Sequence, residues 1–444
     1  MPKLISDFFH GNLFKGDKGV WMIYFFLCMI SLVEVYSASS RMTFGSETHW
    51  GPLISQAGFL LMGLLVILFI HHVPCKWFML VPFILFPLSI LLLLIAVLGI
   101  GGGSVNDTNR WIQVFGISFQ PSEVAKAALI MSAAVVLAKT QTEKLVRKGG
   151  KERVIVGAMK GKRHTAFAVV GSMTLLVCGL IFIDNISTSA MLFLVITLMM
   201  FIAHVPMDLM LKGLGSLALL AGFMVFLAFT IPEPVWEEIP GCKRVVTLKH
   251  RLERKFAQSE QNQGEGKVFD PQRLLNDENS QTSYAFIAVA NSNIIGKGPG
   301  NSIQRDFLQH AESDFIYAII FEELGIFGAV FVIFLYVSLL IRCGRIAQKC
   351  RRFFPAYLVL GFGIMMVLQA LVNMGVAVGL FPVTGQTLPL ISKGGTSILI
   401  TSFYIGVILS VSRYAEEAQY ARLDVQPSTE SGETKEYLTD GTMD

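Results

Sequence analysis

Acidic side chains at the start of an apolar run are the first sign of chemistry in this sequence. Residues 310–325 read HAESDFIYAIIFEELG, and Glu312 and Asp314 come directly before the apolar part. Glu322 and Glu323 lie about 12 Å further along it, at a rise of 1.5 Å per residue. Carboxylates at that depth in a membrane-length run are costly and are by default functional candidates. The pattern predicts one role for the acidic residues at the start of the helix, Glu312 and Asp314, and a different role for Glu322 and Glu323 inside it.

Asp314, at the entrance, admits two interpretations. The structural one is an N-cap, or a negative charge at the positive end of the helix dipole. Ser313 could cap the helix equally well, however, and the turn Gly296-Lys297-Gly298 comes shortly before it. A base next to a cation and flexible backbone suits a phosphate-bearing substrate. The spacing leaves both interpretations open.

The inner carboxylates, Glu322 and Glu323, have a cation available in another apolar run. Lys126 lies deep in the run that begins at Pro121, where a lysine needs a carboxylate partner. Glu123 can supply one within the same helix at spacing i, i+3. Glu322 or Glu323 can supply one from another helix. We therefore predict that these four charged residues form a structural ion-pair network between the two helices, in preference to a catalytic group.

The segment 381–397 reads FPVTGQTLPLISKGGTS and joins two apolar runs. Its prolines, glycines and hydroxyl residues indicate ordered, non-helical backbone that lines a cavity or is covered by protein. A plain turn is the alternative. Lys393 beside Gly394 and Gly395 favours contact with an anion.

A second polar segment, 109–126, reads NRWIQVFGISFQPSEVAK. Arg110 and Trp111 are expected at the membrane interface, and Pro121 is expected at a helix start. An interfacial tryptophan anchor and a Pro-Ser-Glu helix start are the plain interpretation of Trp111 and Pro121.

The composition shows what kind of protein must position these residues. Of 444 residues 53% are hydrophobic and only 15% are charged, and the mean hydropathy is +0.58, far from the balance of a soluble domain. Apolar runs long enough to cross a hydrocarbon core of about 30 Å occur ten times. They are 20–39, 53–71, 78–100, 121–138, 165–183, 187–204, 213–231, 315–341, 355–379 and 397–412. The sequence predicts an all-α polytopic membrane protein with ten transmembrane helices.

The basic residues predict its orientation. The loop 139–163 holds nine Lys or Arg residues against two Glu, and 342–352 holds five against no acid. The positive-inside rule places both loops in the cytoplasm, and ten helices then put both termini there. The chain divides into a cytoplasmic segment 1–19, a membrane domain 20–412 and a polar tail 413–444 that we predict to be disordered. The net charge of +4 is a topology signal and indicates no nucleic-acid partner.

One outside loop, 232–313, lies between the seventh and eighth helices and is too long for a plain connection. Its first part, KRVVTLKHRLERKFAQSEQNQGEGK, is predicted to be helical before a glycine break. Its later part, SYAFIAVANSNIIGKGPGNSIQ, becomes apolar again, and we predict that it folds back against the membrane domain.

Four segments stand out by their order and spacing: NRWI with FQPSEVAK, NSNIIGKGPGNSIQ, SDFIYAIIFEELG and PVTGQTLPLISKGGTS. They resemble the signature segments of the SEDS family (shape, elongation, division and sporulation), and the resemblance covers essentially residues 20–412. Members are ten-helix bacterial inner-membrane proteins that polymerise lipid II into glycan strands. The TGQTLPLISKGGTS segment and Val411-Ser412-Arg413 are more similar to the division members than to the elongation members.

The resemblance implies, by position, that Asp314 is the catalytic residue. It also implies substrate-binding residues, for which we take Arg110, Trp111, Lys297, Ser392, Lys393 and Gly394. Further signature positions are Gln120, Pro121, Ser122, Glu123, Lys126, Glu322, Glu323, Pro382, Thr384, Gly385, Pro389 and Gly395. The chain departs from the family pattern at Gln309-His310-Ala311-Glu312, at Asp184–Thr188, and at Lys393, where an aromatic residue is common. These departures leave Asp314 unaffected but weaken any role assigned to Glu312 or to the 184–188 turn.

The implied reaction suits these residues. The 4-hydroxyl of one lipid II disaccharide attacks the anomeric carbon of another and expels a lipid pyrophosphate, and an ionised aspartate can be the general base. Arg110, Lys297 and Lys393 are candidates to bind the pyrophosphate. A divalent cation, Mg²⁺ or Mn²⁺, is a further candidate, held by Asp314 and substrate phosphates, although the sequence shows no metal cage.

The resemblance also implies partners and location. The expected partners are a class B penicillin-binding protein and other division proteins, and the expected location is the inner membrane at the division septum. Three alternatives stay open: an elongation polymerase, a lipid II flippase or transporter, and a scaffold that only recruits the penicillin-binding protein. The polar cluster at the outer rim and the lack of a visible inverted repeat favour chemistry over transport.

Overall fold

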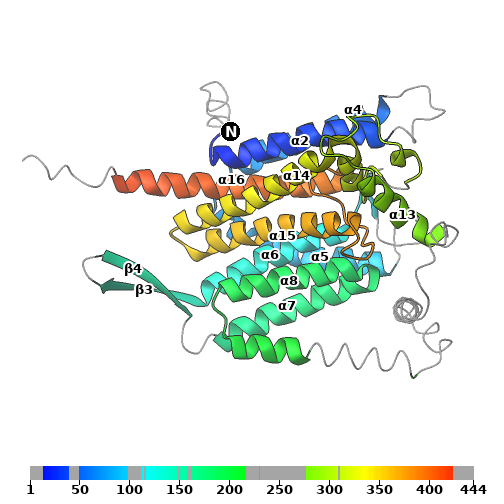
Figure 1. Ribbon diagram of the computed structural model, residues 1–444. Helices are drawn as coiled ribbons and strands as arrows, with labels where there is room; N and C mark the ends of the chain where they lie inside the picture. Colours follow the sequence, from blue (N-terminus) through cyan, green and yellow to red (C-terminus); the bar gives the residue numbers. More distant parts are fainter. Residues whose placement is uncertain are drawn as a thin grey trace, which may run out of the picture.

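The protein is a bundle of roughly parallel helices in a computed structural model (Figure 1). The structure describes residues 14–39, 50–98, 112–114, 117–148, 151–158, 163–216, 230, 277–308 and 311–423. Eight helices in these ranges are long and apolar enough to cross a membrane, and Ile186–Ile202 is a shorter apolar helix. The predicted all-α polytopic fold is therefore confirmed. Most of the predicted seventh span, 213–231, lies outside the described residues.

The membrane-length helices follow the predicted runs closely. In chain order the helices are α2 (Lys18–Ala38), α4 (Gly51–Ile70), α5 (Val81–Val97), α6 (Pro121–Lys139), α7 (Arg163–Asp184), α8 (Ile186–Ile202), α13 (Asp277–Ala290), α14 (Ile316–Lys349), α15 (Phe353–Ala377) and α16 (Gly395–Leu423). Short 3-10 helices cover Trp77–Met79 and Gln304–Asp306.

The strands of the described chain lie outside the membrane-length helices, in two antiparallel hairpins. One pairs β1 (Ile112–Val114) with β2 (Ile117–Phe119), and the other pairs β3 (Gln141–Lys148) with β4 (Lys151–Ala158). The β3–β4 hairpin occupies the basic loop that the sequence placed in the cytoplasm.

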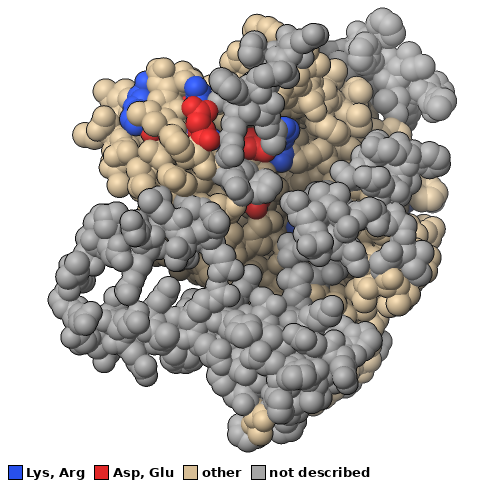
Figure 2. All heavy atoms as spheres, turned by 90° about the vertical axis from the view of Figure 1, so that its right-hand side faces the viewer, with Lys and Arg blue, Asp and Glu red and all other residues tan. Residues whose placement is uncertain are grey.

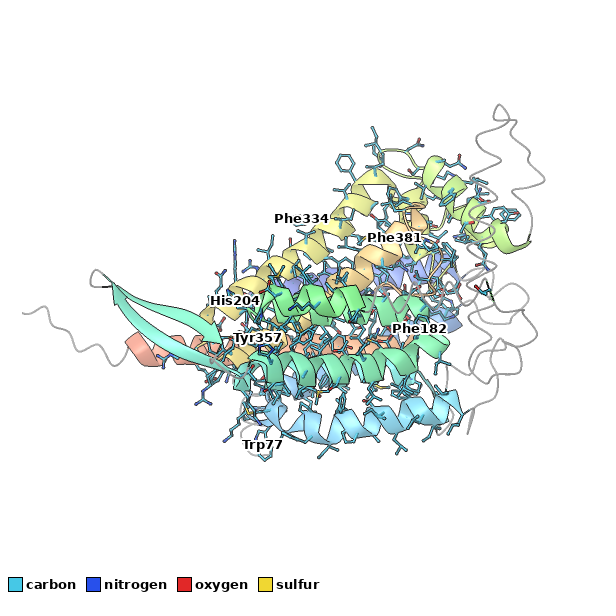
Figure 3. All side chains as sticks on the ribbon, turned by 90° about the horizontal axis from the view of Figure 1, so that it is seen from below. Trp77, Phe182, His204, Phe334, Tyr357 and Phe381 are labelled. Carbon is cyan, nitrogen blue, oxygen red and sulfur yellow. The ribbon has the colours of Figure 1, made fainter. Side chains whose placement is uncertain are left out.

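The two ends of the bundle differ in what they carry. The β3–β4 hairpin, the start of α2 and the far end of α16 lie at the left-hand end of Figure 1, and α13 lies at the right-hand end. Seen from below, Trp77, His204 and Tyr357 lie toward the hairpin end, and Phe182 and Phe381 lie toward the opposite end (Figure 3). We call the end that carries α13 the outer end.

Helices α6, α16 and α15 form the centre of the bundle. In the apolar stretch of α6 89% of the residues are buried, in that of α16 72% and in that of α15 67%, against 22% in α4. Small residues explain this position, because Ala125, Ala127, Ala128, Ala133 and Ala134 let neighbouring helices approach α6 closely. Pro121 begins α6 at its first helical position, as predicted.

Two helix ends differ from the predictions. Helix α14 continues past 341 to Lys349, and α16 continues past 412 to Leu423, so the predicted tail begins as helix. No proline or glycine stops α16 there, and its Ala, Glu, Gln and Arg residues are good helix formers. At the α7–α8 junction the side chain of Asn185 accepts the N–H groups of Ser187 and Thr188 and caps α8.

The N-cap of α2 gives a first test of the fold. Asp17 Oδ1 accepts the N–H of Val20 at 3.1 Å, and Asp17 Oδ2 lies 3.5 Å from Arg342 Nη1. We expect Asp17→Ala to lower the free energy of unfolding by about 1 kcal/mol, because the cap is lost. Asp17→Asn is the matched control, since asparagine caps as well as aspartate. Thermal unfolding in detergent measures both, and equal losses would assign the effect to the ion pair instead of the cap.

Candidate polymerase site

Helix α14 is broken near its outer end at Gly325, which has φ 69° and ψ −170° inside the helix. The backbone groups freed by the break bond to the loop that follows α13. Lys297 N and Gly298 N donate to the carbonyl oxygens of Glu322 and Glu323 at 3.0 and 2.8 Å. Ile326 N donates in turn to the carbonyl oxygen of Asn293 at 3.1 Å. Irregular backbone at membrane depth is satisfied here by protein, as it must be.

The two glycines at this contact allow the backbones to meet. A Cβ at Gly296 would lie 2.3 Å from the Glu323 carbonyl oxygen, and a Cβ at Gly325 would lie 2.4 Å from the Gly296 nitrogen. Both glycines also have positive φ, which disfavours other residues. The predicted return of the 283–304 segment to the membrane domain is therefore confirmed, and Gly296 and Gly325 allow the two backbones to approach this closely.

The Glu322 carboxylate is fully buried and is enclosed by this loop. Its Oε1 lies 2.5 Å from Lys297 Nζ, and its Oε2 accepts the hydroxyl of Ser302 at 2.5 Å. The N–H groups of Ile303 and Gln304 donate to it at 3.3 and 3.2 Å. Charge-assisted bonds to a buried carboxylate are the strong kind, so this contact fixes the loop on α14.

The Glu323 carboxylate, also fully buried, joins the same loop to α2. It accepts the hydroxyl of Ser37, and the N–H groups of Gly300 and Ser302 donate to it at 3.0 and 3.1 Å. Arg305 Nη1 lies 3.8 Å away and donates to the Ser37 hydroxyl at 2.9 Å. The two adjacent glutamates therefore bind one loop from two sides.

The prediction that Lys126 pairs with Glu322 or Glu323 is wrong. Lys126 is fully buried, and its Nζ lies 2.7 Å from Glu123 Oε1 and 3.1 Å from Gln369 Oε1. The i, i+3 pair predicted within α6 forms, but the second bond goes to α15. The cations for the α14 glutamates are Lys297 and Arg305, which the loop supplies locally. The single predicted network is thus two separate ones.

Asp314 is half-buried at the outer end, and its main chain is held from two sides. Asn373 Nδ2 donates to the carbonyl oxygen of Asp314 at 2.8 Å, and the hydroxyl of Ser392 donates to the carbonyl oxygen of Ser313 at 2.5 Å. Lys393 N donates to the carbonyl oxygen of Glu312 at 2.8 Å. Since α14 begins at Ile316 with Phe315 at the N-cap, Asp314 is not the N-cap residue.

The predicted substrate-binding residues fall into three groups. Ser392 and Lys393 bond to the backbone of residues 313 and 312, next to the candidate base, and Gly394 follows them in the chain. The ammonium of Lys297 is engaged by Glu322, which gives it a structural partner. Arg110 and Trp111 lie outside the described residues.

Several polar residues of this end were not singled out by sequence reasoning. They are Ser37, Ser302, Arg305, Gln369, Asn373 and Gln386. The available signal was polarity inside an apolar run, since Gln369 and Asn373 are amides four residues apart in α15 and therefore share a face. Their partners could not be read from spacing.

A divalent cation finds few protein ligands in this region. Among the described residues no group of three or more His, Cys, Asp or Glu side chains is placed to hold a metal. A hard cation that takes six or more oxygen ligands would therefore need most of them from water and substrate phosphates. Asp314 is the side chain that could contribute directly.

Charge is sparse on the described part of the outer face. Viewed from that end, acidic and basic side chains form a few small groups on a mostly uncharged surface (Figure 2). An apolar cavity of about 540 Å³ lies elsewhere, between α7, α8 and residues 210–216, and Phe167, Phe193 and Met200 are among its lining residues.

The fold and this end define a class: a polytopic membrane protein with an aspartate whose main chain is held at the outer end of its helix bundle. A family model described as "Cell cycle protein", covering FtsW, RodA and SpoVE, matches residues 18–417. The chain belongs to this family, and the resemblance to the SEDS family is confirmed.

Two of the similar curated relatives carry the same name. The chain is 32% identical over 399 residues to the "Probable peptidoglycan glycosyltransferase FtsW" of Saccharophagus degradans, with 86% of this chain and 89% of the relative covered. It is 29% identical over 415 residues to the protein of the same name from Enterococcus hirae, with 90% and 94% covered.

Solved structures share the fold. A chain from "Structural coordination of polymerization and crosslinking by a peptidoglycan synthase complex" matches with a TM-score of 0.66 and 24% identity, covering 90% of this chain and 98% of that one. The rod shape determining protein RodA of Thermus thermophilus matches with a TM-score of 0.56 and 21% identity, covering 90% and 97%. At these identities the likeness concerns the fold alone.

Proposed function

We propose that this protein is a peptidoglycan glycosyltransferase that polymerises lipid II into glycan strands for the division septum. The observation that carries the proposal is the placement of Asp314, whose main chain is bound by Asn373 and whose neighbour Ser313 is bound by Ser392. A half-buried aspartate whose main chain is held at the outer end of the bundle suits a general base on a polar headgroup. The relatives named as glycosyltransferases support the same activity.

The proposed step is a displacement at a sugar carbon. Asp314 accepts the proton of the acceptor's 4-hydroxyl, the oxygen bonds to the anomeric carbon of the donor, and the bond from that carbon to the lipid pyrophosphate breaks. The pyrophosphate leaves with the bonding electron pair and needs positive charge nearby.

The described contacts bear on one of the candidate cations. Lys393 follows Ser392 in the segment bound to residues 312–313, so we assign it to the pyrophosphate, and Gly394 is the next residue in the chain. Arg110 and Trp111, which lie outside the described residues, are also proposed to bind the substrate. Lys297 is assigned to holding the loop on Glu322. A divalent cation, when bound, would add charge neutralisation at the phosphates.

We propose the location and the partners of the protein from its family membership and from the topology of its helices. The chain is a multi-pass bacterial membrane protein. We propose that both termini are cytoplasmic, because the basic β3–β4 hairpin lies at the same end of the bundle as the start of α2 and the far end of α16. A class B penicillin-binding protein and other division proteins are the proposed partners.

Labelled lipid II supplied to the purified protein tests the proposal. We expect glycan ladders on a gel from the wild-type chain together with its penicillin-binding partner. If this complex makes no ladders while the partner alone is correctly folded, the glycosyltransferase assignment is wrong.

Lipid transport is the second candidate, favoured by the 540 Å³ apolar cavity near the inner ends of α7 and α8. A cavity of this kind could receive an acyl chain. Translocation of labelled lipid II across proteoliposomes without ladder formation would support transport over polymerisation.

A further inference from the structure

Two amide side chains of α15, Gln369 and Asn373, lie on one face of the helix and are 4% and 1% exposed. Neither is needed to form a helix, and buried amides in a membrane bundle are costly unless their hydrogen bonds are satisfied. Their four-residue spacing places both toward the same neighbours. What they bind is therefore informative about their role.

Asn373 joins two segments that are distant in sequence. Its Nδ2 donates to the carbonyl oxygen of Asp314 at 2.8 Å and to that of Gln386 at 2.7 Å. Only the NH₂ group of an asparagine can donate to carbonyl oxygens, so this arrangement fixes the orientation of the amide. One side chain thereby sets the distance between the backbone of the candidate base and the backbone of the 386–392 segment.

Gln369, one helical turn before Asn373 in α15, also donates to the backbone of the 386–392 segment. Its Nε2 donates to the carbonyl oxygen of Thr387 at 3.1 Å, and its Oε1 accepts Lys126 Nζ at 3.1 Å. The Glu123–Lys126 pair holds this amide from the other side, and a cation on the carbonyl side strengthens the N–H donors of the same amide. The buried ion pair of α6 therefore acts on the 386–392 segment through Gln369.

A second set of hydrogen bonds, made by Ser392, joins the 386–392 segment to the backbone next to Asp314. Ser392 Oγ accepts the N–H of Leu388 at 2.7 Å and donates to the carbonyl oxygen of Ser313 at 2.5 Å. The backbone around Asp314 and the backbone that leads to Lys393 are thus joined twice, once through Asn373 and once through Ser392.

We propose that Asn373 and Gln369 are positioning residues. They hold the 386–392 segment, which leads to Lys393, at a fixed position relative to Asp314. The catalytic consequence of this inference rests on the proposed function. In that function one face of α15 positions both the base, Asp314, and the segment that leads to Lys393, which binds the pyrophosphate. It assigns Glu123 and Lys126 a role in that positioning, beyond holding helices together.

Asn373→Asp tests the proposal, because a carboxylate has the same shape and cannot donate to two carbonyl oxygens. We expect kcat for lipid II polymerisation to fall about 10- to 100-fold while KM stays within about twofold, since a displacement near 1 Å can cost that much. Gln369→Glu is the second variant, which keeps the acceptor for Lys126 and loses the donor to Thr387. A smaller fall in kcat is expected there.

Leu371→Ala is the matched control, because Leu371 lies on the same helix with a side chain 42% exposed. Hydrogen exchange is the second readout and does not depend on activity. We expect amides of 311–318 and 384–392 to exchange faster together in both amide variants and to be unchanged in Leu371→Ala.

The outcomes separate the two proposals. Wild-type kcat and wild-type exchange in both amide variants would overturn the positioning role. A lower melting temperature with an unchanged rate per folded molecule would also overturn it, because the amides would then be structural only. Coupled faster exchange with no polymerisation even by wild type would keep the positioning geometry and reject the glycosyltransferase assignment.

Discussion

Asp314→Asn is expected to abolish glycan polymerisation and to leave the fold intact. Asparagine has the same shape but cannot accept the proton of the acceptor hydroxyl, and loss of a general base costs about 10²–10⁴ in rate. The contact of Asn373 is to the main-chain oxygen of residue 314, so it persists in the variant. Ladder formation from labelled lipid II gives the rate, and a melting curve in detergent shows that the variant is folded.

Asp306→Asn makes the same chemical change at an exposed aspartate of the outer loop and is the matched control. Its carboxylate is 56% exposed and lies 3.7 Å from Arg305 Nε, so little activity should depend on it. Full activity in Asp314→Asn would remove Asp314 from the mechanism. Equal losses in the two variants would point to loop charge as the cause.

Glu322→Leu is expected to give the largest loss of stability, about 3–5 kcal/mol. The substitution leaves Lys297 Nζ without the carboxylate at 2.5 Å and leaves Ser302 and two backbone N–H groups without their acceptor. Breaking a buried ion pair by removing one partner costs that much because the remaining groups stay desolvated. Thermal unfolding in detergent measures the effect.

A double-mutant cycle with Lys297→Met isolates the pair. Lys297 is 25% exposed, so its removal should cost less than that of Glu322, and the double variant should lose less than the sum of the two single losses. Additive losses would show that the backbone donors of the 303–304 turn, and not Lys297, stabilise the Glu322 carboxylate.

This loop also bears on activity, because residues 297–305 lead directly into the segment that carries Asp314. Glu322 and Glu323 fix the loop on α14, and Ser37 ties it to α2. We therefore expect Glu322→Leu to lose polymerisation together with stability, whereas Asp314→Asn should lose polymerisation alone. Activity per folded molecule separates these two kinds of loss.

The sequence by itself determined much of the architecture. Hydropathy located the membrane-length helices because a helix needs about 20 apolar residues to cross the hydrocarbon core. Local spacing also found the Glu123–Lys126 pair, since residues three apart on a helix are neighbours. The unusual acids in HAESDFIYAIIFEELG marked both the candidate base and the two glutamates inside the helix.

The tertiary structure alone decided which partners these residues have. Spacing left Lys126 with a choice of carboxylates, and it gave no sign that Gln369 would supply the second contact or that Lys297 would take Glu322. The break at Gly325 was equally hidden, because glycine occurs both inside intact helices and at breaks. Local pattern fixes only contacts within one element. Contacts between elements depend on which helix faces pack together, and the cost of burying an unpaired polar group then selects the partners within reach.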